Sequence, residues 1–325
     1  MSVKSNLLKL LENNQGTFVS GAALARELSV SRNAVWKAVE SLRKEGYDIS
    51  AVTNKGYRLE RRSDAISKAG IAAHLKSEGV FYIDVRKTVT STNTILRELA
   101  AGGAQEWYVV VAEEQTAGKG RMGRSFHSPA GHGIYFSLLL HPGQKSIDAT
   151  LITSAAAVAT ARAIEEVIGV SVGIKWVNDL FVGDKKVCGI LTEATFDMES
   201  GLIESAVLGI GVNVTKPKSG YPDGVENVAT AVTSRQSGGD SERCRLIAAT
   251  LESFRELYQN LSARQFLKEY RTRSILLGKD IYVVTHDGNR PARVLDIDDD
   301  CRLVVEYENG EVAALNSGEV STRVS

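Results

Sequence analysis

The feature that most constrains this chain is a stretch in which two apolar runs flank a loop of glycines and cations. Residues 109–112 and 133–140 are apolar enough to be buried strands of one sheet. The loop between them contains Gly118, Lys119, Gly120, Arg121, Gly123 and Arg124. Glycines let a backbone approach a ligand closely and adopt positive φ, while Lys and Arg attract negative charge. The stretch therefore predicts a loop between two buried strands that closes on an anion.

Two other interpretations of this loop remain open. Gly118, Gly120 and Gly123 have the spacing of a dinucleotide-binding fingerprint, but that motif needs a helix to begin within it, so that the pyrophosphate meets the helix N-terminus. Residues 126–131 are instead typical of a loop and lead into another strand, which disfavours a dinucleotide site. The other interpretation is a mobile hairpin whose cations are simply solvated.

Length and charge bound the domain organisation. The chain has 325 residues, of which 43% are hydrophobic and 24% charged, as in a globular protein of two or three domains. The formal net charge is zero, but residues 1–62 hold eleven Lys and Arg against six Asp and Glu. This surplus of positive charge predicts that the N-terminal part meets a polyanion, and it leaves the remainder of the chain acidic.

Cysteine and histidine usage argues against a metal centre or a disulfide framework. Cys188, Cys244 and Cys301 lie far apart with no CxxC pair, and the five histidines have no ligand spacing. We therefore expect no zinc, no tightly bound redox cofactor and a reducing compartment. No apolar run approaches the ~18 residues of a membrane span, and the first sixteen residues lack the apolar core of a signal peptide. We expect a cytoplasmic protein with no membrane partner.

The first 62 residues have the pattern of a winged helix-turn-helix domain. Ser20 can cap a helix that leads through a turn into a third helix at about 32–44, whose apolar residues Val35, Val39 and Leu42 share one face. Residues 47–52 and 57–59 predict two short strands joined by a glycine turn, which form the wing. The helix-turn-helix runs from Gly21 to Glu40, and the predicted DNA contacts are Arg32, Asn33 and Lys37 in the major groove and Lys55 on a phosphate. A small helical bundle with a solvated basic face is the alternative.

Residues 66–273 predict one α+β domain after a polar linker at 61–64. A helix at 67–75 and a strand at 81–85 precede the polar segment from Thr88 to Thr94, which holds more hydroxyl and amide groups than one helix cap needs. An alanine-rich helix follows at 150–168, then strands near 172–176, 180–182, 185–194 and 202–214. Such hairpins predict a mixed, largely antiparallel sheet with helices on one face.

The last part of the chain predicts a separate small β domain. Residues 216–239 are expected to form a surface loop, and helices are expected at about 241–260 and 263–272. From residue 274 to 325 short alternating apolar runs are separated by turns rich in Asp, Asn and Gly, which is typical of a small β barrel.

Several motifs, taken in chain order, resemble the bifunctional biotin protein ligases and biotin operon repressors of bacteria. They are the winged helix-turn-helix, Ser91-Thr92-Asn93, the sequence 115–121, Lys175-Trp176-Val177-Asn178-Asp179, the sequence 185–191 and Gly209-Ile210-Gly211-Val212-Asn213. Together they span nearly the whole chain. Two positions depart from the family pattern: Lys119 stands where an arginine is common, and Val177 stands where proline is common. Neither departure removes a functional group.

The resemblance implies a fold and a reaction. The central domain is expected to be like class II aminoacyl-tRNA synthetases, and the C-terminal domain like an SH3 barrel. In the implied reaction the biotin carboxylate attacks the α-phosphorus of ATP, giving biotinyl-5′-AMP and pyrophosphate. The adenylate then acylates a lysine of the biotin carboxyl carrier protein of acetyl-CoA carboxylase. Two anions must meet, so cations are needed where charge develops on the α-phosphate.

The resemblance also assigns roles to residues. The implied catalytic residues are Arg121, Lys175 and Lys186. Lys186, and not its neighbour Lys185 on the opposite strand face, is the one expected to touch the biotin carboxylate. The implied biotin-binding residues are Ser91, Thr92, Asn93, Gln115, Lys119, Gly120, Arg121 and Lys186. The implied ATP-binding residues are Gly118, Arg121, Arg124, Lys175, Asn213 and Arg323. Asn178 and Asp179 are oxygen ligands of the type that Mg²⁺ accepts, although a structural turn explains them equally well.

The implied partners are the carrier protein, operator DNA and a second copy of the chain. A homodimer reads two half-sites, and edge strands of the central sheet are where we expect it to form. Two alternative functions stay open. The first is a DNA-binding regulator whose central domain only senses a small anion, and the second is a ligase of the related lipoate type.

Overall fold

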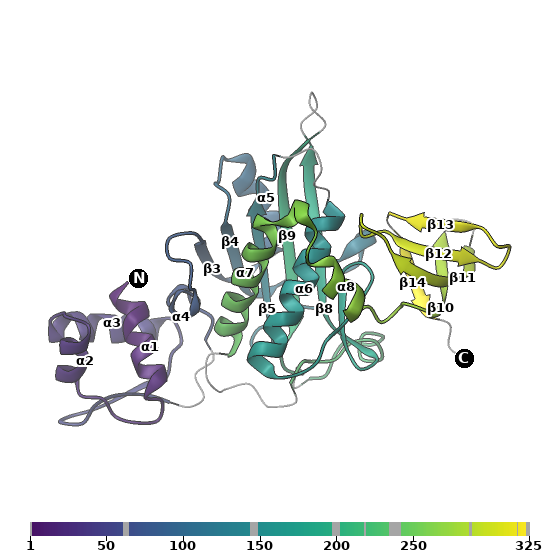
Figure 1. Cartoon of the computed structure of the whole chain (residues 1–325). Coiled ribbons are helices and arrows are strands. Elements are labelled where there is room, and N and C mark those ends of the chain that lie inside the picture. Colours follow the sequence, from purple (N-terminus) through teal and green to yellow (C-terminus); the bar gives the residue numbers. More distant parts are fainter. Residues whose placement is uncertain are drawn as a thin grey trace.

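The computed structural model describes residues 2–60, 65–143, 149–196, 202–217, 219–233, 242–285, 288–316 and 318–322. Its three parts follow one another along an elongated molecule (Figure 1). The N-terminal helices lie at one end, a large sheet with its helices lies in the middle, and a small β unit lies at the other end. The predicted linker at 61–64 falls outside the described residues.

The N-terminal part is the predicted winged helix-turn-helix. It consists of α1 (Val3–Asn13), α2 (Gly21–Glu27), α3 (Arg32–Lys44), β1 (Ile49–Val52) and β2 (Gly56–Leu59). Ser20 and Ser31 cap α2 and α3 because each hydroxyl accepts the N–H of the residue three positions later, at 3.1 Å. The wing strands pair antiparallel around a turn in which Asn54 has φ 65° and Gly56 φ 105°. The predicted helices and wing are thereby confirmed.

The winged domain packs against α4 (Lys68–His74) and α7 (Glu242–Gln259). Ala69 of α4 belongs to the same apolar cluster as the core of the winged domain. The buried Tyr47 hydroxyl lies 3.1 Å from Ser67 Oγ and 4.0 Å from Cys244 Sγ. A Cβ on Gly70 would come within 2.2 Å of that hydroxyl, so this contact is close enough to require glycine.

Among the described residues, seven strands form the central sheet in the order β3-β4-β5-β9-β8-β7-β6. β3 and β4 are parallel and every other neighbouring pair is antiparallel, which confirms the mixed, largely antiparallel prediction. The strands are β3 (Tyr82–Val89), β4 (Tyr108–Gln115), β5 (Gly133–Leu140), β6 (Gly173–Lys175), β7 (Asp179–Val182), β8 (Lys185–Phe196) and β9 (Ile203–Asn213).

Helices cover both faces of this sheet. The main layer, α6 (Ala149–Ile168) and α7, shares one apolar cluster with Val109 and Val111 of β4 (Figure 1). The buried alanines of α6 let it lie close to the sheet. The expectation of helices on one face needs one addition, because α5 (Thr92–Ala101) packs on the opposite face. There Leu96 meets Val110, whose side chain points away from its neighbours in β4.

The C-terminal part is the expected small β unit. Its five described strands form an antiparallel sheet in the order β13-β12-β11-β10-β14. They are β10 (Asp280–Thr285), β11 (Gly288–Ile297), β12 (Leu303–Tyr307), β13 (Val312–Leu315) and β14 (Glu319–Thr322). Their apolar side chains continue the core cluster of the central domain. The junction includes α8 (Leu267–Arg273) and a hydrogen bond of 2.8 Å from Trp176 Nε1 to the carbonyl of Cys301. Within the described part of the chain, no helix combines the length and apolar character that crossing a membrane requires.

Candidate functional site

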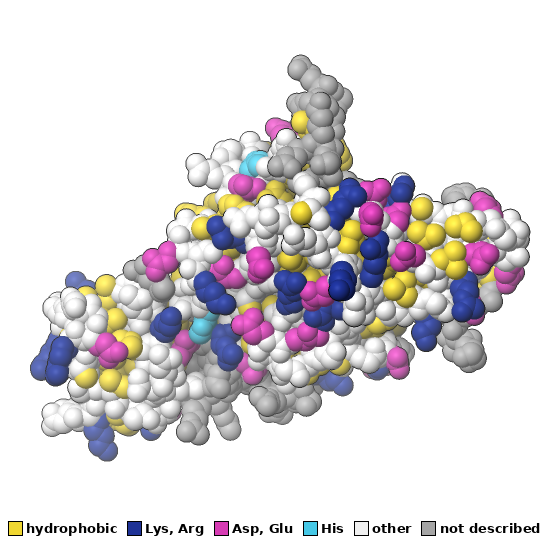
Figure 2. All heavy atoms as spheres, viewed as in Figure 1, with side chains coloured by type: hydrophobic (Ala, Val, Ile, Leu, Met, Phe, Trp, Pro, Cys, Tyr) yellow, Lys and Arg dark blue, Asp and Glu magenta, His cyan; other side chains and the backbone are white. Residues whose placement is uncertain are grey.

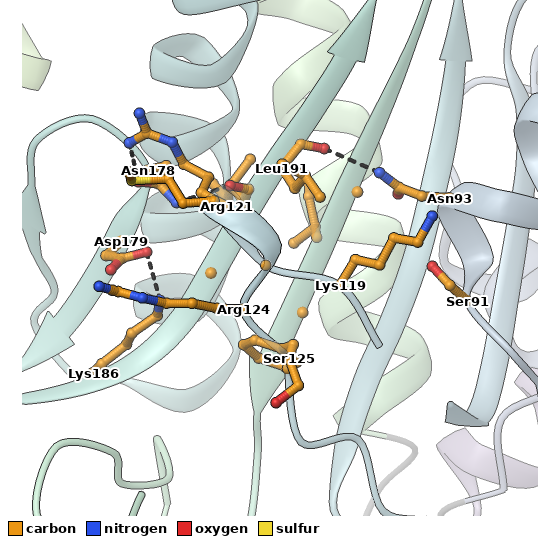
Figure 3. Close-up of a pocket in the computed structure, with 18 of the residues that line it drawn as sticks. Ser91, Asn93, Lys119, Arg121, Arg124, Ser125, Asn178, Asp179, Lys186 and Leu191 are labelled. Carbon is orange, nitrogen blue, oxygen red and sulfur yellow. Dashed lines mark hydrogen bonds and ion pairs between the residues drawn. The ribbon is translucent and has the colours of Figure 1, made fainter. Parts of the chain in front are cut away.

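A pocket of about 180 Å³ lies at the central sheet, where the predicted motifs converge (Figure 3). Its walls come from the β3–α5 junction, the loop after β4, the β6–β7 junction, β8 and β9. Gly318 and Val320 of the C-terminal unit also line it. The predicted site residues that line this pocket are Ser91, Thr92, Asn93, Gln115, Lys119, Gly120, Arg121, Arg124, Lys175, Asn178, Asp179 and Lys186.

Three predicted residues are placed differently. Gly118 lies behind the pocket wall, where a Cβ would be 2.4 Å from the carbonyl oxygen of Phe126. Asn213 lies at the end of β9, and its Nδ2 donates to the carbonyl of Thr230 at 3.3 Å. Neither residue lines the pocket. Arg323 falls outside the described residues, three positions after the pocket residue Val320.

The hydroxyl and amide side of the pocket is held by a defined set of hydrogen bonds. Gln115 Oε1 accepts from the backbone N–H of Thr92 at 2.8 Å and from its hydroxyl at 3.2 Å, while Gln115 Nε2 donates to Ser128 Oγ at 2.9 Å. The orientation of the Gln115 carboxamide is therefore set by the protein. Ser91 occupies the N-cap position of α5, is 2% exposed, and makes no side-chain capping bond. Helix capping thus does not explain its hydroxyl.

A second set of bonds supports the floor beneath these residues. Ser137 Oγ, fully buried in β5, lies 2.6 Å from Asn93 Oδ1 and 2.7 Å from Thr92 Oγ1. Asn93 Nδ2 donates to Glu193 Oε2 at 2.7 Å, and Arg97 pairs with the other oxygen of Glu193 at 3.1 Å. Both ends of the Asn93 carboxamide are engaged, so its part is to hold the pocket wall. A Cβ on Gly209 would lie 2.1 Å from Asn93 Oδ1, which leaves room there only for glycine.

The cationic side of the pocket is built on the β6–β7 junction. Arg121 Nη1 donates to Asn178 Oδ1 at 3.0 Å, and Lys186 Nζ lies 2.7 Å from Asp179 Oδ1 (Figure 3). Lys185 is exposed and its Nζ donates to the carbonyl of Glu226 at 3.0 Å. The two adjacent lysines therefore point to different environments, as alternation along a strand requires.

The aromatic ring of Phe126 closes the pocket against two glycines of the sheet. A Cβ on Gly211 would lie 2.6 Å from Phe126 Cε1, and one on Gly189 would lie 3.2 Å from Cε2. Burial raises the pKa of the neighbouring Cys188 thiol, and Lys186 opposes this only partly. The thiol therefore stays protonated at neutral pH, and Cys188 fits no nucleophilic role.

The glycine loop uses its glycines differently from the prediction. Only Gly123, at φ 75°, adopts positive φ, together with Met122 at φ 55°; Gly120 has φ −115°. The loop folds back on itself, since Phe126 N donates to the carbonyl of Gly118 at 2.8 Å and Gly120 N donates to that of Arg124 at 2.7 Å. A single 3₁₀ turn at Arg121–Gly123 is the only helical element between β4 and β5 in this described segment, and the α-helix that the dinucleotide fingerprint requires does not begin there.

The junction that contains the unusual Val177 is fixed by its neighbours. Tyr270 of α8 donates its hydroxyl hydrogen to the carbonyl of Val177 at 3.0 Å, and Val177 is buried. Asn178 Nδ2 donates to the carbonyl of Ile190 at 2.9 Å, and Ile190 N donates to that of Asn178 at 3.0 Å. Contacts from α8 and β8 therefore hold the segment that presents Asn178 and Asp179.

Of the two residues predicted to bind Mg²⁺, Asn178 and Asp179, only Asp179 is suited to that role. Asn178 already uses its oxygen for Arg121 and its nitrogen for Ile190, whereas the carboxylate of Asp179 is paired with the ammonium of Lys186. In the described part of the chain, no three or more His, Cys, Asp or Glu residues gather in a way that could hold a metal. The donor set matches an ion held by one carboxylate and substrate oxygens, which is how Mg²⁺ binds alongside phosphate.

The four residues predicted to contact DNA are all exposed on the winged domain. Arg32, Asn33 and Lys37 are exposed on α3, and Lys55 is exposed at the tip of the wing. Figure 2 shows Lys and Arg side chains along this end of the molecule. The buried face of α3 carries Val35, Ala38, Val39 and Leu42, so packing orients the polar face outward.

Sequence reasoning missed the supporting residues of the pocket. Ser128, Ser137 and Glu193 touch the predicted side chains but lie outside the recognised motifs. The serine at 137 within the apolar run 133–140 was a signal, since a buried hydroxyl needs a partner. Nothing local indicated that this partner lies 44 residues away.

Family models match three parts of the chain, and two curated proteins are similar to nearly all of it. A model described as the biotin/lipoate A/B protein ligase family matches residues 85–213, an HTH domain model matches 3–58, and a model of the biotin protein ligase C terminal domain matches 276–323. A protein of Bacillus spizizenii named bifunctional ligase/repressor BirA is 36% identical over 319 residues, which are 95% of each chain. A protein of the same name from Escherichia coli is 28% identical over 329 residues, 99% of this chain and 98% of that one.

A solved structure has the same fold. The biotin protein ligase from Aquifex aeolicus in complex with biotin and ATP is 25% identical, has a TM-score of 0.62, and covers 75% of this chain and 99% of its own. The fold and the pocket thus define a ligase-type catalytic unit joined to a DNA-binding domain. With a relative at 36% identity matched over nearly its full length, the chain belongs to the biotin/lipoate A/B protein ligase family, among its bifunctional ligase/repressor members.

Proposed function

We propose that the chain is an ATP-dependent biotin–[acetyl-CoA-carboxylase] ligase and a biotin-responsive repressor of biotin genes. The observation that carries the ligase half is the convergence of two opposite chemistries in one pocket. Arg121, Lys175 and Lys186 bring positive charge to one side, while Thr92 and Gln115 bring oriented donors and acceptors to the other. A substrate with a carboxylate at one end and a cyclic urea at the other fits this division.

The first step is the attack of the biotin carboxylate on the α-phosphorus of ATP. The bond to pyrophosphate breaks as the acyl phosphate bond forms, and biotinyl-5′-AMP results. Lys186 and Arg121 stabilise the negative charge that develops on the α-phosphate, because they are already positioned by Asp179 and Asn178 and need little reorganisation. We propose that Lys175, Arg124 and Arg323 contact the nucleotide, and that Mg²⁺, when bound by Asp179 with phosphate oxygens, neutralises charge on the phosphates.

The ureido ring is proposed to lie on the Ser91, Thr92 and Gln115 side. Gln115 can exchange its bond to Ser128 for one to the ligand without leaving a buried donor unpaired. The backbone of residues 119–121 covers the ligand. In the second step a lysine of the biotin carboxyl carrier protein attacks the acyl group and AMP leaves.

A pyrophosphate-release assay with biotin and with lipoate tests this half. We expect release that depends on biotin and ATP, and transfer of biotin to a carrier domain. Release with lipoate alone assigns the chain to the lipoate type, and release with neither substrate supports a regulator that only senses an anion.

The repressor half is supported by the winged domain, in which Arg32, Asn33 and Lys37 are exposed on α3 and Lys55 is exposed on the wing. One such domain neutralises few phosphates, so its non-specific dissociation constant is roughly 10⁻⁴ to 10⁻⁶ M. A homodimer can hold two half-sites, and specific complexes reach ~10⁻⁸ to 10⁻¹¹ M. We propose that the operator is an inverted repeat, and that residues 1–62, 66–273 and 274–325 divide DNA binding, catalysis and nucleotide closure among them.

The free edge of β8 is the proposed site of dimerisation. β7 pairs with residues 185–189 of β8 and Asn178 bonds to Ile190, and no described strand pairs on that side of residues 191–196. Phe196, at the end of this segment, is 57% exposed. An unpaired strand edge with an exposed apolar residue is suited to pairing with the same edge of a second copy.

The same edge is linked to the pocket by hydrogen bonds. Glu193 of β8 accepts from Asn93, Asn93 is bonded to Ser137, and Ser137 meets Thr92 in the proposed biotin site. A ligand that changes the partners of Thr92 therefore changes the bonds that hold Glu193. Ordering the loop around the adenylate lowers the entropic cost of association as well.

Sedimentation with and without biotin plus ATP tests this coupling. For Glu193→Gln we expect adenylate synthesis to persist while ligand-dependent dimerisation weakens. Glu204→Gln, an exposed glutamate on β9, is the matched control. Dimerisation of the Glu193 variant that responds to ligand as the wild type does would contradict this route.

A further inference from the structure

The outward face of α3 carries one large apolar side chain that the proposed DNA contacts leave unexplained. Trp36 is 52% exposed, although tryptophan is usually well buried in folded proteins. It is absent from the residues that form or pack on the apolar cluster of the winged domain, as far as the described residues go. The stability of the domain therefore gives no reason for a tryptophan at this position.

Its position places it in the centre of the polar stripe. Trp36 follows Arg32 by four residues and Asn33 by three, so the three side chains are neighbours on the helix surface. Lys37 completes the stripe on the side of Asn33, whereas Val35, Ala38 and Val39 are buried against the rest of the domain. Any duplex that meets Arg32, Asn33 and Lys37 in its major groove must also meet the indole ring.

The charges around Trp36 favour DNA over another protein as the occupant of this face. Arg32, Lys37 and the wing residue Lys55 are exposed cations, and the N-terminal 62 residues carry eleven Lys and Arg against six Asp and Glu. Arg43, about two turns further along, is instead engaged within the domain, because it donates to the carbonyl of Ile49 at 2.9 Å and pairs with Glu40 at 2.7 Å. Arg32 and Lys37 thus place exposed cations on the N-terminal half of α3, which is the half that enters the groove in helix-turn-helix complexes, while the exposed Lys44 lies at its C-terminal end.

We propose that Trp36 is a specificity-determining residue that reads thymine in each operator half-site through the C5-methyl group. This inference rests on the proposed repressor function. The major groove presents hydrogen-bonding groups at every base pair, and the thymine methyl is its one apolar group. The indole ring is large, apolar and has a single N–H donor, so it gains the most binding free energy where it covers the thymine methyl. Over the polar edges of other bases it displaces water without replacing the lost hydrogen bonds. Trp36 thereby adds a preference for thymine to the groove contacts of Arg32, Asn33 and Lys37, while Lys55 on a phosphate adds affinity that does not depend on sequence.

The test replaces thymine by deoxyuridine, which removes the methyl group and keeps the base pair. A duplex is first selected from a random library by the full-length protein with biotin and ATP, and each thymine is then replaced in turn. Burying one methyl group corresponds to about a fourfold change in affinity. We expect one thymine per half-site at which the wild type loses about fourfold, and about fifteenfold when both half-sites are changed.

The decisive measurement combines the base change with Trp36→Ala. The variant should bind the selected duplex more weakly and should no longer respond to deoxyuridine at that position. Val3→Ala, which truncates an exposed apolar side chain of α1 in the same domain, should respond as the wild type does. Unchanged adenylate synthesis and thermal unfolding show that Trp36→Ala is folded.

Two results overturn the inference. One is a wild-type protein that binds every deoxyuridine duplex as tightly as the thymine duplex. The other is a Trp36→Ala protein that remains as sensitive to the methyl group as the wild type. If the wild type selects no duplex at all, the repressor function itself fails, and that outcome is distinct from both.

Discussion

Lys186→Ala separates the chemistry of the pocket from the stability of the fold. The ammonium lies 2.7 Å from Asp179 Oδ1, and the two side chains are 30% and 25% exposed. Removing it leaves the carboxylate of Asp179 facing the place where the proposed reaction brings two further anions together. Both the loss of a cation and the unmasked carboxylate disfavour adenylate formation.

The two consequences differ in size. A partly exposed ion pair contributes about 1 kcal/mol or less to stability, so the unfolding midpoint should shift little. A single preorganised contact to developing charge contributes roughly 3 kcal/mol to a transition state, which corresponds to on the order of a hundredfold in rate. We therefore expect a loss of adenylate synthesis of that order without unfolding.

Pyrophosphate release at saturating biotin and ATP, with urea unfolding alongside, measures both quantities. Lys185→Ala is the matched control, because Lys185 is adjacent, exposed and bonded only to the carbonyl of Glu226 among the contacts identified. Wild-type pyrophosphate release by Lys186→Ala would falsify the assignment. Equal losses in both variants would mean that charge near β8 matters and the particular contact does not.

Three further predictions follow from the loop, the floor of the pocket and the domain organisation. Arg121→Gly should form the adenylate at a reduced but measurable rate, because one of the two cations at the α-phosphate is lost, and should release it, so that lysines of bystander proteins become biotinylated; retention as long as in the wild type would exclude Arg121 as the closing group. Gly211→Ala places a methyl group 2.6 Å from Phe126 Cε1, so biotin affinity measured by calorimetry should fall about tenfold or more, and unchanged affinity would show that the ring moves freely. Deleting residues 1–62 should abolish DNA binding in a gel-shift titration and leave carrier biotinylation intact, whereas loss of both would mean that the winged domain supports the active site.

Most of the fold could be predicted from local sequence patterns. The caps at Ser20 and Ser31, the apolar spacing of α3 and the glycine turn of the wing are all decided within a few residues, so the winged domain could be predicted almost residue by residue. The same holds for α6, because its many alanines predict a helix that can pack closely on the sheet. The second helical layer was different. α5 packs on the far face because Val110 points there, and the pattern of β4 alone, buried on both faces, shows no alternation from which this could be predicted.

The pocket likewise combines features that the sequence predicts with contacts that depend on the tertiary structure. The sequence indicated a cation-bearing loop, a polar junction before α5 and a lysine on β8, because glycine, charge and hydroxyl groups are chemical properties that each residue carries with it. The partners of these residues depend on strand order. Ser137, Asn93 and Glu193 meet only because β5, β9 and β8 are neighbours and α5 covers their outer face. Which glycines adopt positive φ was likewise settled by loop closure.

The sequence by itself therefore determined the elements, the charged and polar groups and the family to which they point. Only the tertiary structure decided which of those groups share a pocket, why Asn213 and Gly118 lie outside it, and which residue holds Val177 in place. The physical reason is that propensity and capping act over a few residues, whereas tertiary hydrogen bonds such as those from Asn93 to Glu193 and from Trp176 to Cys301 join positions 100 and 125 residues apart.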